Sequence, residues 1–125
     1  MRYQPNPTHR NISTGKSQWS INKNEEKQSF NRSVQNGWIL NDKGWGLHLP
    51  NGTPDWLSFA QDHITRVFIA KFVGNANHIW HGYPADYVNH AQDIPHQDIV
   101  FRWINANYFT GAKARKILRG QRCTL

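Results

Sequence analysis

The run RVFIAKFV, from Arg66 to Val73, constrains the fold more than any other stretch of this chain. Most of its residues are β-branched or aromatic, and these residue types favour the pleated, buried surface of a sheet. Gly74 and Asn75 follow the run, and both residue types are common in turns. The run therefore predicts a buried β-strand over residues 66–73.

A hairpin is predicted over residues 37–49, where two short apolar runs surround a polar turn that contains Asn41, Asp42 and Gly44. In the second run, three apolar side chains alternate with other residues: Trp45, Leu47 and Leu49. Because successive side chains of a strand point to opposite faces, His48 is expected on the face opposite those three.

Residues 49–64 allow two interpretations. Asn51 and Gly52 could turn a second hairpin. Alternatively, Thr53 caps a short helix that begins at Pro54, with Asp55 near its positive end. Helical spacing would place three apolar residues on one face: Trp56, Leu57 and Ala60. That shared face makes the helix the preferred interpretation.

The last third of the chain predicts two helices. Pro95 suits a first helical turn, and apolar residues then recur at helical spacing: Ile99, Val100, Trp103, Ile104 and Tyr108. Thr110 and Gly111 interrupt this pattern, and a second helix over AKARKILRGQR is closed by Gly120.

These elements predict an α+β fold, with a small antiparallel sheet (hairpin 37–49 and strand 66–73) packed by the C-terminal helices. A length of 125 residues suits a single domain, which we place at residues 36–125. Residues 1–35 are rich in Asn, Ser, Gln and Lys, so they predict a flexible or loosely docked arm. Trp19, Ile21 and Phe30 are its expected anchors.

Composition restricts the surroundings and the partners. No run approaches the roughly 18 apolar residues that cross a membrane, and the N-terminal stretch has no apolar signal segment. We therefore expect no membrane partner. Cys123 is the only cysteine, which indicates a reducing, cytoplasmic setting, and no motif indicates a cofactor. With 15 Lys and Arg against 8 Asp and Glu, the net charge of +7 favours nucleic acid or another polyanion.

The stretch HIWHGYPADYVNH, from His78 to His90, gathers histidines and aromatics directly after the predicted strand. Gly82 and Pro84 are expected to force a turn there. A metal could in principle use His78, His81, His90 and Asp86. Because paired cysteines and the zinc-hydrolase spacing of two histidines are both missing, we predict no metal site.

A metal-independent ribonuclease needs a base, an acid and a cation near the phosphate. Two of His78, His81 and His48 could move the protons, since imidazole titrates near pH 6.5. The cation would be Arg66, Lys71 or Arg102. Tyr83 or Trp80 could stack a base. In the alternative structural interpretation, the same stretch is a loop whose tyrosines pack and whose Asp86 caps a turn.

The second C-terminal helix carries a basic face that no acidic residue interrupts: Lys113, Arg115, Lys116, Arg119 and Arg122. Its apolar side contains Ala114, Ile117 and Leu118. Such a face suits contacts with phosphates, which weaken steeply with salt. Alternatively, it is only the solvated side of a terminal helix.

Six tryptophans are the remaining feature. Four are expected in the core: Trp38, Trp45, Trp56 and Trp103. Trp19 is expected to dock the arm, while Trp80 could pack or stack a base.

Three functions follow from the sequence. The leading hypothesis is a small basic protein that binds the phosphate backbone of nucleic acid through the C-terminal helix, with Trp80 and Tyr83 completing the surface. The first alternative is a ribonuclease that uses His78, His81 and Arg66. The second alternative is an aromatic-rich protein-interaction module or a homodimer.

Overall fold

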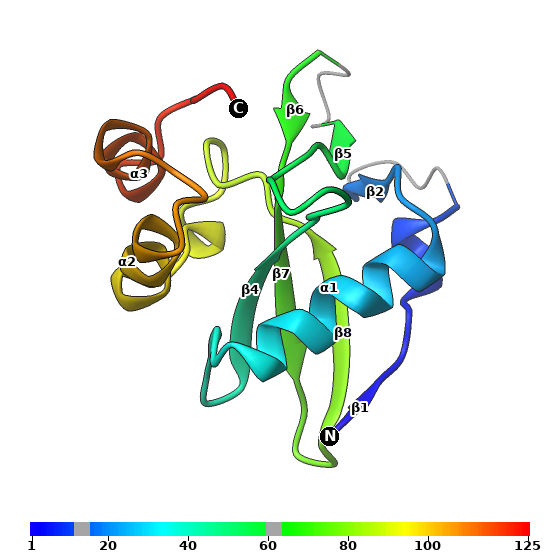
Figure 1. Cartoon of the computed structure of the whole chain (residues 1–125). Helices are drawn as coiled ribbons and strands as arrows, with labels where there is room; N and C mark the ends of the chain where they lie inside the picture. The colour runs from blue at the N-terminus through cyan, green and yellow to red at the C-terminus, as the bar shows by residue number, and fades with distance from the viewer. Residues whose placement is uncertain (12–15, 60–63) are drawn as a thin grey trace.

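Within the described part of the chain there are two mainly antiparallel sheets and three α-helices, which confirms the α+β prediction (Figure 1). The structure is a computed structural model, and it describes residues 1–11, 16–59 and 64–125. Five strands form the larger sheet in the order β1-β8-β7-β4-β3, and three short strands form the smaller one in the order β2-β5-β6.

The centre of the larger sheet is the antiparallel trio β4 (Lys43–Leu47), β7 (Ile69–Gly74) and β8 (Ile79–Pro84). At one edge, β3 (Ile39–Leu40) pairs with β4 across the turn at residues 41–42, which confirms the predicted hairpin. At the other edge, β1 (Arg2–Tyr3) runs parallel to β8. The N-terminal segment therefore contributes a strand to the sheet.

The smaller sheet joins β2 (Gln18–Trp19), β5 (Ser58–Phe59) and β6 (Arg66–Val67). The predicted strand 66–73 is thus divided between the two sheets. Phe68 and Ile69 are neighbours in sequence, yet both pack into the same core cluster. Two consecutive residues of a regular strand point to opposite faces, so the chain departs from regular strand geometry at this point.

The helices begin at residues that can cap them. In α1 (Lys23–Gln35), the Asn22 side chain accepts from the backbone of Glu25, and the Glu25 carboxylate accepts from the backbone of Asn22. Both predicted C-terminal helices are present, as α2 (Gln97–Asn105) and α3 (Gly111–Leu118). Thr110, which was expected to separate them, is the N-cap of α3.

α1 covers one face of the larger sheet, and the C-terminal helices pack against part of the other face, where β8 is only half-buried. Figure 1 shows α1 crossing in front of β4, β7 and β8, with α2 and α3 to the left. The core under α1 contains Tyr3, Trp19, Ile21, Phe30, Leu57, Val67, Ala70, Phe72 and Trp80. The second core includes Trp38, Trp45, Leu47, Ile69, Val100, Trp103 and Ile117.

The N-terminal segment packs against the sheet as part of the α1-side core. All three expected anchors, Trp19, Ile21 and Phe30, are buried. In addition, the Glu26 carboxylate is fully buried and accepts hydrogen bonds from the Tyr3 hydroxyl and from the Arg10 guanidinium, at 2.7 and 3.0 Å for the latter. The polar composition of residues 1–35 gave no sign of this pairing, which joins the first ten residues to α1.

The helix preferred for residues 53–60 is wrong. Residues 58–59 are strand β5, and Ala60 lies outside the described residues. An isolated bridge between His48 and Asp55 instead closes a turn that includes Gly52 at φ 83°. This agrees with the alternative interpretation, in which residues 51–52 turn the chain back. The strand form wins because Ser58 pairs with both Trp19 and Val67.

The sequence suggested that Gly82 lies in a turn. In the structure it lies in the middle of β8 instead. A Cβ atom at this position would lie 2.5 Å from the Tyr3 hydroxyl and 2.6 Å from a ring carbon of Phe72. We predict that Gly82→Ala lowers the free energy of unfolding by about 1–3 kcal/mol, because the core has to move to admit the methyl group. Urea denaturation measures the effect.

The control for this prediction is Gly111→Ala at the start of α3, where the nearest atom outside the neighbouring residues would be 3.6 Å away. This variant should be neutral or slightly stabilising, since alanine favours helix. Equal stability of the two variants would contradict the packing account of Gly82.

Arg10 supplies the positive charge for the buried Glu26. We predict that Arg10→Gln destabilises the protein by about 3–5 kcal/mol, because it leaves a buried carboxylate without its cation. Arg2→Gln, at an exposed position, should stay within about 0.5 kcal/mol. The double variant Arg10→Gln/Glu26→Gln should recover part of the loss. A double variant less stable than Arg10→Gln alone would argue against the pairing.

Candidate functional site

The histidine-rich stretch forms the second half of a β-hairpin. His78 occupies the turn between β7 and β8 with a φ of 59°, and its side chain is exposed. His81 lies within β8, half-buried, with Nδ1 2.7 Å from the carbonyl oxygen of Gln4. That contact requires the proton on Nδ1 and ties His81 to the N-terminal segment. The two histidines therefore have different surroundings.

Arg66 does not join these histidines. It lies in β6 at the far end of β7 from the His78 turn, on the order of 25 Å along the strand direction. Its guanidinium lies over the rings of Trp56 and Phe59, 5.3 and 5.9 Å from their centres. The structure thus separates the three residues expected to form a ribonuclease centre.

The other two cations considered for a phosphate are engaged elsewhere. Lys71 is 4% exposed, and its ammonium group donates to the Gln92 carbonyl at 2.5 Å and lies 3.4 Å from the Asp93 carboxylate. Arg102 is exposed and donates to the backbone carbonyl of Asn36. Lys71 in particular is a core residue that has no access to a bound phosphate.

The two aromatic residues expected to stack a base also lie inside the fold. Trp80 is buried against Phe30, with 5.7 Å between ring centres. Tyr83 is half-buried, and its hydroxyl donates to Asp93 at 2.7 Å. Burial and the neighbouring Asp93 carboxylate raise the pKa of Tyr83. Tyr83 therefore packs, as the structural interpretation proposed, and of the two roles left open for Trp80 the structure has the packed one.

Among the residues that the structure describes, no three His, Cys, Asp or Glu side chains gather as a metal site. Asp86, one of the ligands considered, is instead buried and accepts a hydrogen bond from the side-chain amide of Asn89 at 2.8 Å.

The tryptophans do not form an exposed surface. Five of them are buried and Trp56 is half-buried.

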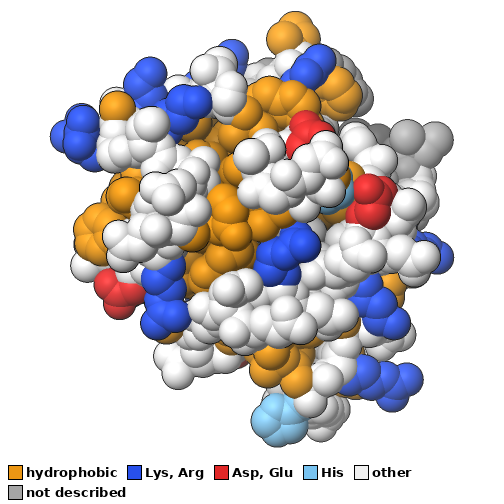
Figure 2. Space-filling view, in the orientation of Figure 1, with side chains coloured by type: hydrophobic (Ala, Val, Ile, Leu, Met, Phe, Trp, Pro, Cys, Tyr) orange, Lys and Arg blue, Asp and Glu red, His pale blue; other side chains and the backbone are white. Residues whose placement is uncertain are grey.

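The basic residues of α3 lie on its outer side. Ala114 and Ile117 are buried in the core, as the helical pattern predicted. The outward side chains of Arg115, Lys116 and Arg119 are exposed, and Lys113 is half-exposed. Arg122 follows the helix and is also exposed. Figure 2 shows Lys and Arg side chains gathered over α3, at the upper left of this face. We call these five residues the α3 cationic surface.

The cations of α3 also have a structural role. Arg115 and Lys116 lie in the last turn, where positive charge stabilises the negative end of the helix dipole. The geometry is therefore suited to binding an anion and to stabilising the helix, and the two roles need separate measurements.

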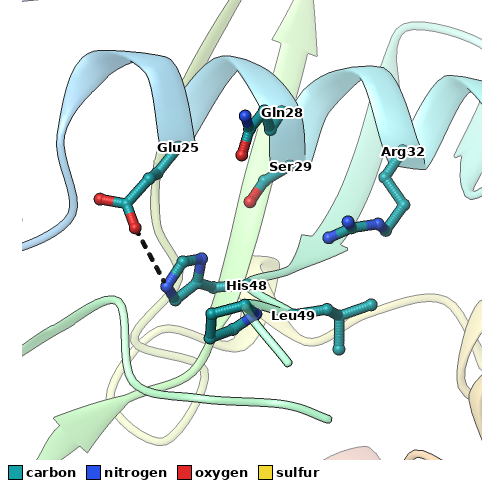
Figure 3. A pocket seen from close by; sticks show the side chains of 7 residues that line it. Glu25, Gln28, Ser29, Arg32, His48 and Leu49 are labelled. Atoms are coloured by element: carbon teal, nitrogen blue, oxygen red, sulfur yellow. Dashed lines mark ion pairs between the residues drawn. The ribbon is translucent and has the colours of Figure 1, made fainter. Parts of the chain in front are cut away.

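A second feature, not expected from the sequence, is an open groove between α1 and the segment after β4 (Figure 3). Its volume is about 290 Å³. Four polar residues of α1 form one wall: Glu25, Gln28, Ser29 and Arg32. The facing segment contributes His48, Leu49 and Pro50. His48 lies on the face opposite Trp45 and Leu47, as predicted, and this orientation brings it beneath α1.

One end of the groove holds an ion-pair geometry. The Glu25 Oε2 atom lies 3.5 Å from Nε2 of His48, while Oε1 is held by the backbone of Asn22. Figure 3 shows Arg32 farther along the helix, on the same side as Ser29. The groove therefore has an acidic and an imidazole group at one end and a guanidinium at the other.

Sequence reasoning considered His48 but missed its neighbours on α1. The available signal was the spacing 25, 28, 29 and 32, which repeats as i, i+3, i+4 and i+7 and so marks one helical face. Such a face is usually apolar where a helix packs on a domain. Here it is polar throughout, and the buried residues of the helix are Glu26, Ser29, Phe30 and Ser33, of which Ser29 belongs to both faces.

Comparison with protein-family models, with curated proteins and with solved structures finds no match for this chain. Among the residues that the structure describes, the helices are all too short or too polar to span a bilayer.

His9 lies in the N-terminal segment and packs against β8. Its ring is stacked on that of Tyr83, with 5.4 Å between the ring centres, and its Nδ1 atom is 2.8 Å from the Ser17 carbonyl oxygen. Burial lowers the pKa of His9 below its ordinary value of 6.5, although the Ser17 carbonyl favours protonation. The folded state therefore prefers the neutral ring. The contribution of the neutral His9 ring to the free energy of unfolding is complete above pH 6.5, and it is lost as the pH falls below that value.

We predict that His9→Phe, which keeps an aromatic ring against Tyr83, loses less stability between pH 7.5 and pH 5 than the unaltered protein does. Urea denaturation at both pH values measures this difference. His90→Gln at an exposed position is the control and should change the pH dependence less. An unchanged pH dependence in His9→Phe would contradict the account.

Proposed function

We propose that this protein binds the phosphate backbone of nucleic acid through the α3 cationic surface. The observation that carries the proposal is the division of α3 into two sides. The buried side anchors the helix through Ala114 and Ile117, and the outer side presents cations. No Asp or Glu follows Asp98 in the chain, so the sequence around α3 is rich in cations.

Contacts of this kind do not depend on base sequence. Lys and Arg bind phosphate by charge, and each contact releases condensed counterions. Within residues 111–122, Gln121 is the one side-chain amide that could read base edges. We therefore expect similar affinity for strands of different sequence, with a strong dependence on salt. The net charge of +7 adds to the long-range attraction.

The triple variant Arg115→Gln/Lys116→Gln/Arg119→Gln tests the proposal. Fluorescence anisotropy with a labelled single-stranded RNA, measured from 50 to 300 mM salt, gives the slope of log affinity against log salt. We expect the slope to become shallower by about 2, because each phosphate contact with a single strand contributes about 0.7.

The matched control removes three charges from other exposed positions, with Lys23→Gln/Lys27→Gln/Lys43→Gln. It should leave most of the slope in place. If both triple variants change the slope equally, the attraction comes from net charge and not from α3. If the α3 variant only loses stability and keeps its slope, the cations serve the helix and the proposal fails.

A further inference from the structure

We propose that the groove between α1 and residues 48–50 is a binding site for a nucleotide unit, with the phosphate at Arg32 and the sugar and base towards Glu25 and His48. The site is distinct from the α3 cationic surface. The choice of a nucleotide as ligand rests on the proposed function, whereas the existence of a polar site rests on the groove itself.

The polar wall of the groove has donors that the protein does not use. The hydroxyl of Ser29 is buried and has no hydrogen-bond partner within the described part of the chain. Buried polar groups are almost always paired, so an orphaned hydroxyl that lines a groove indicates a missing partner. No hydrogen bond or ion pair joins the side chains of Gln28 or Arg32 to another of the described residues.

The charges of the groove select an elongated ligand with two different ends. Glu25 and Arg32 are seven residues apart on one helical face, which places them about 10 Å apart along the axis. A guanidinium presents a planar set of donors that matches phosphate. The Glu25 carboxylate accepts hydrogen bonds and repels anions. A ligand with a phosphate at one end and N–H or O–H donors at the other satisfies both.

A nucleoside monophosphate fits this description in size and chemistry. The volume of about 290 Å³ is at the lower end of small-molecule sites. Leu49 and Pro50 give the wall opposite α1 an apolar part on which a base can lie. Glu25 is held in position by its capping bond to Asn22, and His48 is held by the bridge to Asp55. The acceptor end is therefore ordered before a ligand arrives.

The experiment is isothermal titration calorimetry, in which the full chain is titrated with each of the four ribonucleoside 5′-monophosphates and, separately, with inorganic phosphate. We expect at least one nucleotide to bind at least tenfold more tightly than phosphate. Arg32→Gln should lower the affinity for that nucleotide at least tenfold. Glu25→Gln should also lower the affinity for the nucleotide, while it leaves the affinity for phosphate unchanged. Thermal denaturation of each variant checks that it is folded.

Arg115→Gln on α3 is the control that separates this site from the proposed function. It should leave mononucleotide binding unchanged while it weakens the binding of long RNA. The inference is overturned if no nucleotide binds at millimolar concentration, if phosphate binds as tightly as any nucleotide, or if folded Arg32→Gln retains full affinity. If the unaltered protein binds a mononucleotide but does not bind long RNA, the result counts against the α3 cationic surface and leaves the groove inference standing.

Discussion

The pairing of the buried Glu26 carboxylate with Tyr3 and Arg10 is the interaction on which the arrangement of this fold depends. The Glu26 carboxylate is fully inaccessible to solvent. It accepts hydrogen bonds from Tyr3 in β1 and from Arg10, farther along the N-terminal segment. A charge in this position is costly unless it is paired, so the three residues have to come together. Their contact joins the N-terminal segment to α1. Because β1 also pairs with β8, the same contact fixes α1 across the sheet, and α1 in turn provides one wall of the groove.

Much of the fold was predictable because its signals are local. The hairpin at residues 37–49 has alternating apolar residues and a polar turn, and the two C-terminal helices have clear periodicity with a break at Thr110 and Gly111. The errors came from long-range packing. Gly82 was expected to turn the chain, but its lack of a side chain serves the close approach of Tyr3 and Phe72 to β8. Likewise, residues 58–59 pair with strands distant in sequence, which outweighs their local helical pattern.

The candidate sites were predicted unevenly for the same reason. The division of α3 into a buried and a cationic side follows from helical spacing alone, and the structure has it. A site built from His78, His81 and Arg66 required knowledge of the sheet register, which places Arg66 at the opposite end of β7. The groove needed two pieces of information, the polar stripe on α1 and the orientation of His48. The sequence contained both, but only the packing of α1 on β4 brings them together.

We propose that nucleic acid contacts this protein through α3 and, for one nucleotide unit, through the groove. The most direct test is to map backbone amide chemical shifts by NMR while a short single-stranded RNA is added. The account predicts the largest changes in residues 111–122, with a second group in residues 25–32 and 48–50. Changes centred on the turn at residues 75–78, or no changes at low salt, would contradict it.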